Sequence, residues 1–252
     1  MLKEIKILRS HGKQYIPDIT KPVLPDTFKG RPIISSIEVD NQELINICPT
    51  EAIEYKNGIT IDIGKCTFCG ECVFRFPNKV RFSNDYKTCT NDRNALIIKQ
   101  GEEQIIKIDH SMVRKEIKSL FGRSLRLREV SAGGDNSSEL ELNATVNPNF
   151  DMARFGIDWV ASPRHADGLV LTGPISKNMA EALQICYDAI PDPKLLILAG
   201  TDAISGGIFA GSPAVDRSFL NDKTVDLYVP GNPVHPLTFV NGILELTRKL
   251  KK

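Results

Sequence analysis

The first 107 residues carry their hydrophobic positions in short runs, each bounded by polar residues or glycine. Apolar and polar residues alternate within these runs, which predicts strands at 36–39 and 58–63. A third run at 95–98 is apolar throughout and is also predicted to be a strand. This part of the chain is therefore expected to be small and rich in strands.

The hydrophobic pattern changes from about residue 124 onward. Unalternating apolar runs at 168–171 and 195–198 are typical of strands that are covered on both faces. Helical stretches at 176–189 and 236–251 lie between and after them. The order strand, helix, strand, helix predicts parallel pairing with right-handed crossovers, and thus a doubly wound α/β domain.

Two segments follow neither pattern. Residues 1–36 hold prolines at 17, 22, 25 and 32 among polar residues, which favours an extended arm. With little core of its own, the arm is expected to lie on the next domain or a partner, or to hang as a loose tail. Residues 108–123 predict a helix whose basic face is solvated or rests on lipid head groups. Its apolar face would comprise Met112, Ile117, Leu120 and Phe121.

Composition narrows the class of protein. The chain has 252 residues, of which 41% are hydrophobic and 25% charged, as in soluble globular proteins. It contains no apolar run long enough to span a membrane and no pattern of a secretion signal, so we expect a cytoplasmic protein. The net charge of +1 is spread along the chain, and nucleic acid is not an expected partner. Six cysteines, four of them at metal-binding spacing, favour a reducing compartment over disulfides.

The clearest chemical pattern is KCTFCGECVFRFP at residues 65–77. Cys66, Cys69 and Cys72 follow one another at intervals of three, and Cys48 precedes Pro49 upstream. A loop with this spacing presents three thiolates to one iron-sulfur cube, and a remote cysteine supplies the fourth. Structural zinc sites also use C-x2-C pairs and are the alternative, but the triplet together with Cys-Pro favours iron and sulfur.

These residues resemble one half of a two-cluster bacterial ferredoxin, in which each run reads C-x2-C-x2-C-x3-C-P and its last cysteine binds the other cluster. The resemblance implies that Cys48, Cys66, Cys69 and Cys72 hold one 4Fe-4S cluster. The second cluster of that family would need cysteines at four further positions. These positions hold Glu38, Asn41, Leu44 and Phe76.

The second half carries long motifs from residue 123 to the end of the chain. They read RSLRLREV, ARFGIDWVASPRHADGLVLTGPISKNM, IPDPKLLILAG and YVPGNP. They resemble the small subunit shared by energy-converting (group 4) nickel-iron hydrogenases and respiratory complex I, where it is the 20 kDa subunit of a quinone oxidoreductase. The N-terminal half resembles the ferredoxin subunit of formate hydrogenlyase. Together the resemblances imply a fusion of the two subunits.

In the small-subunit family, motifs like GSCNGCELE, GTCAISGG and VPGCPP supply four cysteines to a 4Fe-4S cluster. The four matching positions of this chain are occupied by Asp135, Ser138, Asp202 and Asn232. Iron-sulfur clusters are assembled on thiolates, and oxygen-bearing side chains are not expected to hold one. We therefore expect the fold of this domain to persist without its cluster.

The expected organisation is an extended arm (1–36), an α+β ferredoxin-like 4Fe-4S domain (37–107), a linker helix (108–123) and a flavodoxin-like α/β domain of the small-subunit type (124–252). The resemblance implies an electron-transfer or structural subunit with no catalytic residue of its own. Its partners would be a large subunit and a membrane subunit of a hydrogenase-like or complex I-like complex, and a redox donor protein. Through them it would lie peripherally on the cytoplasmic face of the membrane.

Two alternatives remain open at the level of sequence. The chain is a freestanding ferredoxin-type electron carrier whose second domain binds another partner, or the four replaced positions form a new site for a divalent metal ion. Two carboxylates, a hydroxyl and an amide are hard oxygen ligands suited to magnesium, calcium or manganese, and Glu141 lies near enough in sequence to join them.

Overall fold

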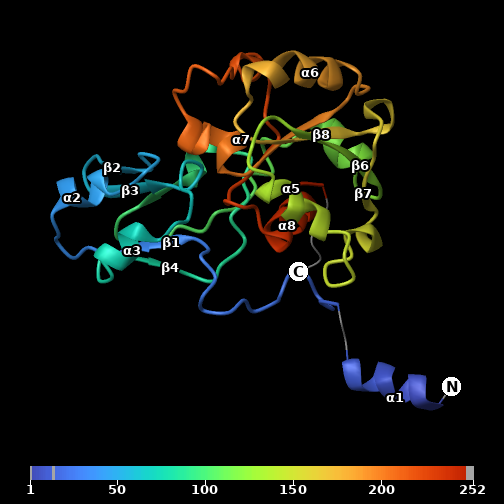
Figure 1. Ribbon diagram of the computed structural model, residues 1–252, viewed down its shortest axis with the longest axis horizontal. Helices are drawn as coiled ribbons and strands as arrows, with labels where there is room; N and C mark the ends of the chain where they lie inside the picture. Colours follow the sequence, from blue (N-terminus) through green and yellow to red (C-terminus); the bar gives the residue numbers. More distant parts are fainter. Residues whose placement is uncertain (1, 13–14, 248–252) are drawn as a thin grey trace.

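The computed structural model describes residues 2–12 and 15–247 (Figure 1). Its helices are α1 (Leu2–His11), α2 (Asn41–Asn46), α3 (Glu71–Arg75), α4 (Lys115–Leu120), α5 (Ser137–Ala144), α6 (Lys177–Asp188), α7 (Thr201–Ser205) and α8 (Pro236–Thr247). Its strands are β1 (Pro32–Ile34), β2 (Ile53–Tyr55), β3 (Ile59–Asp62), β4 (Val80–Phe82), β5 (Ile97–Lys99), β6 (Leu125–Ser131), β7 (Ile157–Trp159), β8 (Gly168–Thr172), β9 (Leu195–Ala199) and β10 (Leu227–Val229).

The second half is built on a five-stranded sheet with the order β10-β9-β8-β6-β7, in which every neighbouring pair is parallel. Counted along this half, the order is 2-1-3-4-5, which is the order of flavodoxin-like sheets. The prediction of a parallel α/β domain is confirmed. β8 and β9 are buried at every position, as their unalternating apolar sequences indicated.

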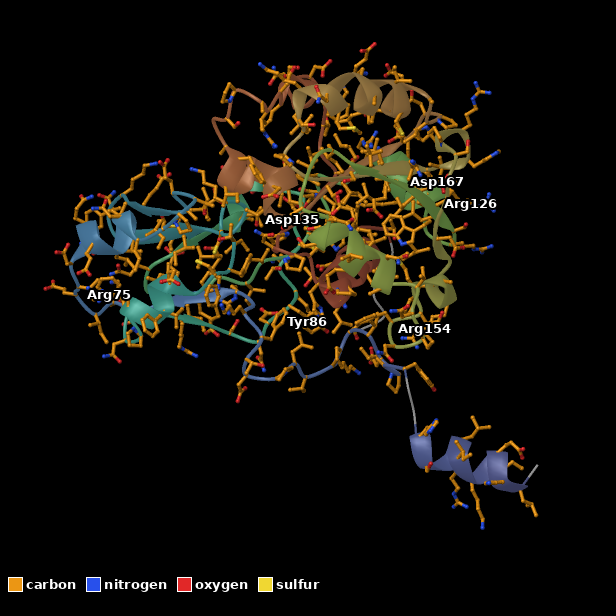
Figure 2. All side chains as sticks on the ribbon, in the orientation of Figure 1. Arg75, Tyr86, Arg126, Asp135, Arg154 and Asp167 are labelled. Atoms are coloured by element: carbon orange, nitrogen blue, oxygen red, sulfur yellow. The ribbon has the colours of Figure 1, made fainter. Side chains whose placement is uncertain are left out.

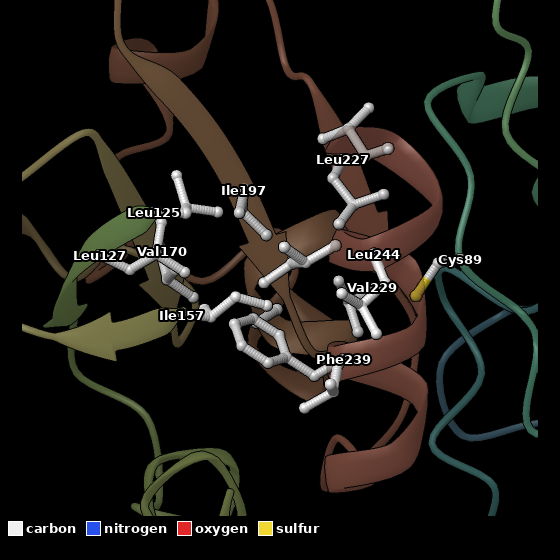
Figure 3. Packing of buried hydrophobic residues seen from close by; sticks show 14 of the residues in the cluster. Cys89, Leu125, Leu127, Ile157, Val170, Ile197, Leu227, Val229, Phe239 and Leu244 are labelled. Atoms are coloured by element: carbon white, nitrogen blue, oxygen red, sulfur yellow. The ribbon is translucent and has the colours of Figure 1, made fainter. Parts of the chain in front are cut away.

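Helices cover both faces of this sheet, because successive side chains of a strand point to opposite sides. On β9, Ile197 faces α5 and α8, whereas Leu198 faces α6. Figure 1 shows α6 on one side of the sheet and α5 and α8 on the other. Figure 3 shows the α8 side, where Phe239 and Leu244 pack against strand residues such as Val170.

The N-terminal half contains two small antiparallel sheets, β2-β3-β5 and β1-β4. Its buried side chains are continuous with those on the α6 side of the parallel sheet. Ile61 and Ile98 of the small sheet belong to the same hydrophobic cluster as Leu171 and Leu198 of β8 and β9. The two halves are therefore packed against each other over a shared apolar surface.

Three predicted strands of the N-terminal half are shifted or shortened. The strand predicted at 36–39 is wrong: the chain pairs earlier, at β1, because Ile34 is buried while Ile37 is 54% exposed. The segment 95–98 begins as a turn of 3₁₀ helix, started by the Asp92 carboxylate that accepts a hydrogen bond from the Asn94 N–H at 2.9 Å. Only 97–99 form a strand there, and 58–63 is confirmed as β3.

The helix predicted over 108–123 is confined to α4. Asp109 forms a turn with Ser111, whose N–H and hydroxyl donate to its carboxylate at 2.9 and 2.7 Å, and this delays the helix. Met112 and Leu120 are each 56% exposed, so the predicted apolar face is wrong for both, whereas Ile117 and Phe121 are buried.

The basic side of α4 is not simply solvated. Arg114, just before the helix, binds the Asp226 carboxylate through two hydrogen bonds of 3.0 and 2.9 Å. Asp226 is buried and also accepts a hydrogen bond from the Leu196 N–H in β9. Arg114 therefore ties this segment to the edge of the parallel sheet.

The N-terminal arm is helical at its start, so the prediction of an extended chain is wrong for α1. All four prolines of the arm follow this helix, which leaves residues 2–11 free to adopt it. Beyond residue 15 the arm lies on the α/β domain rather than hanging free. Ile19 is buried there, and its carbonyl accepts hydrogen bonds from Asn241 of α8 and from Tyr86 at 2.7 and 3.2 Å. Within the described ranges, no helix has the length and apolar character needed to cross a membrane.

Candidate functional site

The four predicted cysteines lie around one cavity in the N-terminal half. Cys48 follows α2, Cys66 follows β3, Cys69 lies in the intervening loop and Cys72 is in the first turn of α3. The remaining lining is almost entirely apolar. Residues far apart in the sequence are thus brought together, and we call this the cysteine cavity.

The loop that carries three of these cysteines adopts an unusual backbone shape. Phe68 and Gly70 have φ angles of 54° and 90°, in the left-handed region, so the chain turns tightly between Cys66 and Cys72. The Phe68 N–H consequently points back and donates to the Cys66 Sγ at 3.3 Å, while the Ala52 N–H donates to the Cys48 Sγ at 3.2 Å. Such hydrogen bonds to sulfur are among the features that tune metal-bound thiolates.

Two thiols of this cavity have raised pKa values and therefore hold their protons tightly. Burial, reinforced by the neighbouring thiols, raises the pKa of Cys66 to about 12, and the same causes raise the pKa of Cys72 to about 11. Thiols in such surroundings stay protonated at neutral pH unless a cation compensates the charge of the thiolates. Metal binding supplies this compensation and releases the protons.

The donors and the lining of the cavity fit an iron-sulfur cube. Four sulfur donors in apolar surroundings suit a soft metal centre. Across residues 2–12 and 15–247, no group of three or more His, Cys, Asp or Glu side chains is arranged as the site of a single metal ion. The thiolates of a cube each bind a different iron atom, so they stand farther apart than thiolates around one zinc ion, where each Zn–S bond is about 2.3 Å.

The four replaced positions all follow strands of the parallel sheet at its carboxyl edge. Asp135 and Ser138 come after β6, Asp202 after β9 and Asn232 after β10. This is the edge at which open α/β sheets bind ligands. Ser138 lies close to the loop after β9, since a Cβ atom at Gly200 would come within 2.8 Å of the Ser138 Oγ.

Asp202 is in an unfavourable place for a charge. Burial is the main reason that its pKa is raised to about 6; Asp135 and Glu139 raise it further, and Arg217 opposes them. Among the described residues its Oδ1 has no hydrogen-bond partner, although it is buried. Asp135 differs, because hydrogen bonds from the Ser137 hydroxyl and N–H lower its pKa.

The loops that carry Asp202 and Asn232 meet, since the Thr201 N–H donates to the Gly231 carbonyl at 2.9 Å. Asn232 lines a second cavity, which it shares with Phe28 of the arm and His235 of the α/β domain. Glu139, rather than Glu141, is the carboxylate that acts on Asp202. Glu139 lies in the first turn of α5, where the helix begins after Asn136.

A buried carboxylate that the sequence did not single out lies close by. Burial, together with Glu139, raises the pKa of Glu129 in β6 to about 7. Glu139 also accepts a hydrogen bond of 2.7 Å from the Thr172 hydroxyl at the end of β8. The carboxyl end of the sheet therefore carries a set of half-buried acids, Glu129, Glu139 and Asp202.

The cysteine cavity and the replaced positions are direct neighbours. The Thr201 hydroxyl, at the start of α7, donates to the Cys66 carbonyl at 2.7 Å, and Gly64 packs so closely on Ile204 that a Cβ atom would lie 2.9 Å from it. Asp202 is the next residue after Thr201. In Figure 2, Asp135 lies where the two halves meet, and Arg75 lies on the far side of the N-terminal half.

Comparisons with known proteins match the second half of the chain. The family model described as "NADH ubiquinone oxidoreductase, 20 Kd subunit" matches residues 136–246. Similar proteins include the "Probable membrane-bound hydrogenase subunit mbhJ" of Pyrococcus furiosus, 36% identical over 132 residues that make up 52% of this chain and 79% of the relative. A subunit of the NADH-quinone oxidoreductase of Heliobacterium modesticaldum is 35% identical over 162 residues, 64% of this chain and 92% of the relative.

Formate hydrogenlyase subunit 7 of Escherichia coli is also similar, with 36% identity over 151 residues, 60% of this chain and 58% of that protein. The predicted likeness of the second half to hydrogenase and complex I small subunits is therefore confirmed at the level of the family. Two of these relatives are matched over 79% and 92% of their own length at more than 30% identity. The chain belongs to the family of the 20 kDa subunit of NADH ubiquinone oxidoreductase.

Proposed function

We propose that this chain is the iron-sulfur subunit of a membrane-associated hydrogenase-like or complex I-like oxidoreductase complex. One 4Fe-4S cluster is held by Cys48, Cys66, Cys69 and Cys72 and transfers electrons. The α/β domain holds no cluster of its own and acts as a structural adaptor. The chain carries electrons or supports its partners, and it has no catalytic residue.

The observation that carries this proposal is the cysteine cavity. Thiols from two segments of the chain, Cys48 and the loop of Cys66, Cys69 and Cys72, share an apolar pocket, and two of them already accept backbone hydrogen bonds. When bound there, the cluster supplies one-electron chemistry. The apolar side chains of the lining would shield it from water on one side, while Cys69 is exposed, and Cys48 and the loop place the four thiols around the same space.

The absence of a cluster in the α/β domain rests on donor chemistry. Asp135, Ser138, Asp202 and Asn232 offer only oxygen and nitrogen atoms, which do not replace thiolates on iron-sulfur clusters. Asn232 lines a cavity to which the other three do not contribute. Without a cluster at this position, the second domain has no iron-sulfur centre that could accept an electron from the cluster of the N-terminal half.

We further propose that the N-terminal half is a ferredoxin-like domain of the formate hydrogenlyase type, fused to the small-subunit domain. Its antiparallel sheets and its cysteine loop support this proposal. The proposed boundaries are 1–36, 37–107, 108–123 and 124–252. Because the two domains share a hydrophobic cluster, they are expected to move as one body.

The proposed partners are a large subunit and a membrane subunit, which hold the chain at the cytoplasmic face of the membrane. The name of the Pyrococcus furiosus relative describes a membrane-bound hydrogenase subunit. In this chain, Ile208 and Phe209 in the loop after α7 and Leu140 on α5 are exposed apolar side chains close to the replaced positions. Such side chains are suited to burial against another subunit.

The test is metal analysis and electron paramagnetic resonance of the anaerobically purified chain. We expect about four irons per chain and one signal from a reduced cluster. Cys69→Ser is expected to remove most of the iron, whereas Cys186→Ser, a control at a half-buried cysteine of α6 outside the cavity, is expected to keep it. About eight irons per chain, or none, would contradict the proposal, and a stoichiometric divalent metal besides iron would favour a replacement site instead.

A second measurement separates the complex from a freestanding carrier. A chain that is purified from its native source as a monomer, with iron but with no other subunit, would favour a freestanding ferredoxin-type carrier. Recovery together with a large subunit and a membrane subunit supports the adaptor role.

A further inference from the structure

A single lysine from the N-terminal arm reaches the cysteine loop. The Lys29 ammonium donates to the Phe68 carbonyl at 3.0 Å and to the Cys69 carbonyl at 2.6 Å. These contacts join residues about forty positions apart in the sequence. They place a positive charge directly against the backbone that carries one of the cavity's sulfur atoms.

The loop is shaped to receive this side chain. A Cβ atom at Gly70 would lie 2.8 Å from the Lys29 Nζ and 3.3 Å from its Cε, so a side chain at this position would force the ammonium to shift. Gly70 also has a φ of 90°, which glycine adopts without strain. The absence of a side chain at Gly70 therefore lets the Lys29 ammonium lie directly against the loop.

The arm is fixed directly after this contact. The Gly30 N–H donates to the Ser83 carbonyl at 2.8 Å, and a side chain at Gly30 would collide with the backbone of Asp85. The Arg31 N–H donates to the Asp85 carbonyl at 3.2 Å. Lys29 is therefore held beside the loop by the backbone that follows it and not only by its own hydrogen bonds.

We propose that Lys29 raises the reduction potential of the cluster, because its ammonium places a fixed positive charge beside the cysteine loop. This inference rests on the proposed function, because it requires a cluster on Cys48, Cys66, Cys69 and Cys72. Reduction adds one negative charge to the cluster, and a fixed cation stabilises the reduced form more than the oxidised form. Net charge around a cluster is one of the main determinants of its potential.

Thr201 provides a neutral comparison, because it contacts the same loop from α7. Its hydroxyl also holds a carbonyl of the loop, that of Cys66, but it carries no charge. Loss of the Thr201 contact is expected to loosen the loop without removing a cation. The two residues therefore separate an electrostatic effect from a purely mechanical one.

The experiment is a redox titration of the full chain, followed by the electron paramagnetic resonance signal of the reduced cluster, with iron content measured on the same samples. Lys29→Gln and Lys29→Met remove the charge, Lys29→Arg keeps it, and Thr201→Val serves as the neutral control. We expect the midpoint potential to become more negative in the Gln and Met variants and to stay near the wild-type value in Lys29→Arg. Thr201→Val is expected to shift it less than either neutral lysine variant.

Salt gives a second readout, because Lys29 is exposed and its field is screened by dissolved ions. The difference in potential between wild type and Lys29→Gln is expected to shrink as ionic strength rises. Equal potentials in all variants would overturn the inference, as would an Arg variant that shifts as far as the Gln variant. If both neutral variants lose their iron while the Arg variant retains it, the role of Lys29 is structural and the inference also fails. A wild-type chain without iron would instead overturn the proposed function.

Discussion

Replacing the Asp202 carboxylate by a neutral amide, in Asp202→Asn, is expected to stabilise the protein at alkaline pH. In the folded chain the pKa of Asp202 is raised from 3.8 to about 6, chiefly by burial. At about 1.4 kcal/mol for each pKa unit, this rise corresponds to about 3 kcal/mol of unfavourable free energy when the group is ionised. Solvent reaches the half-buried side chain and screens it, which reduces the expected value to about 1–2 kcal/mol.

The sign of the pH dependence follows from linkage. An acid whose pKa is higher in the folded state binds its proton more tightly there, so stability falls as pH rises from about 3.8 to about 6. Above about pH 6 the whole cost is present, and below about 3.8 it vanishes. The stabilisation by Asp202→Asn is therefore expected to be full at pH 8 and to drop to about half at pH 5.

The neighbouring cation does not offset this gain. Arg217 donates to the carbonyls of Pro174, Asp202, Ala203 and Ile204, so its guanidinium keeps its hydrogen bonds when the Asp202 charge is removed. A control is Asp135→Asn. Hydrogen bonds from Ser137 lower the pKa of Asp135, so its loss is expected to reduce stability at pH 8 rather than increase it.

The assay is the thermal midpoint of the anaerobic, iron-loaded protein, compared between variant and wild type at pH 8 and pH 5. Iron content is expected to be unchanged in Asp202→Asn, because this side chain is not a proposed ligand. A stabilisation of equal size at both pH values would refute the electrostatic reasoning, and so would a loss of stability at pH 8.

Two further substitutions test the packing and the loop. Phe239→Ala is expected to cost about 3–5 kcal/mol of unfolding free energy, because the ring is fully buried under the sheet, whereas Phe74→Ala, at a ring that is 85% exposed, should change it by less than about 0.5 kcal/mol. Denaturant unfolding compares them, and similar costs would show that burial is misassigned. Gly70→Ala is expected to displace the Lys29 ammonium and so make the midpoint potential of the cluster more negative, while Gly211→Ala, at a φ of 78° with open space around it, carries similar backbone strain and should leave the potential unchanged. Equal shifts of the potential in both variants would mean that backbone strain alone, and not displacement of the lysine, is responsible.

Local sequence determined the elements that are buried on both faces and the spacing of the ligands. The run at β9 is apolar throughout and the run at β8 is apolar up to Thr172. Such short, unalternating runs are typical of strands buried on both faces, so both strands and the parallel sheet were predictable. The cysteine triplet and Cys48-Pro49 likewise predicted which thiols meet, because the spacing of thiolates in a loop is limited by the chain itself.

Elements stabilised mainly by distant contacts were missed or misplaced. β6 reads LRLREVS, a half-polar sequence that is a central strand because β7 and β8 pair with it on either side. The strand expected at 36–39 is replaced by β1, whose partner β4 lies almost fifty residues away. For such short segments the pairing partner decides the strand, and no local pattern contains that information.

The surroundings of the candidate site were decided by tertiary structure alone. The contacts of Lys29 with the Cys69 carbonyl and of Thr201 with the Cys66 carbonyl span 40 and 135 residues of sequence. The raised pKa of Asp202 likewise depends on burial between elements that meet only in the fold. Sequence determined which atoms are available for chemistry, since thiols and carboxylates are fixed by residue type. Folding decided the electric field and the solvent around those atoms, because both depend on groups that are remote along the chain.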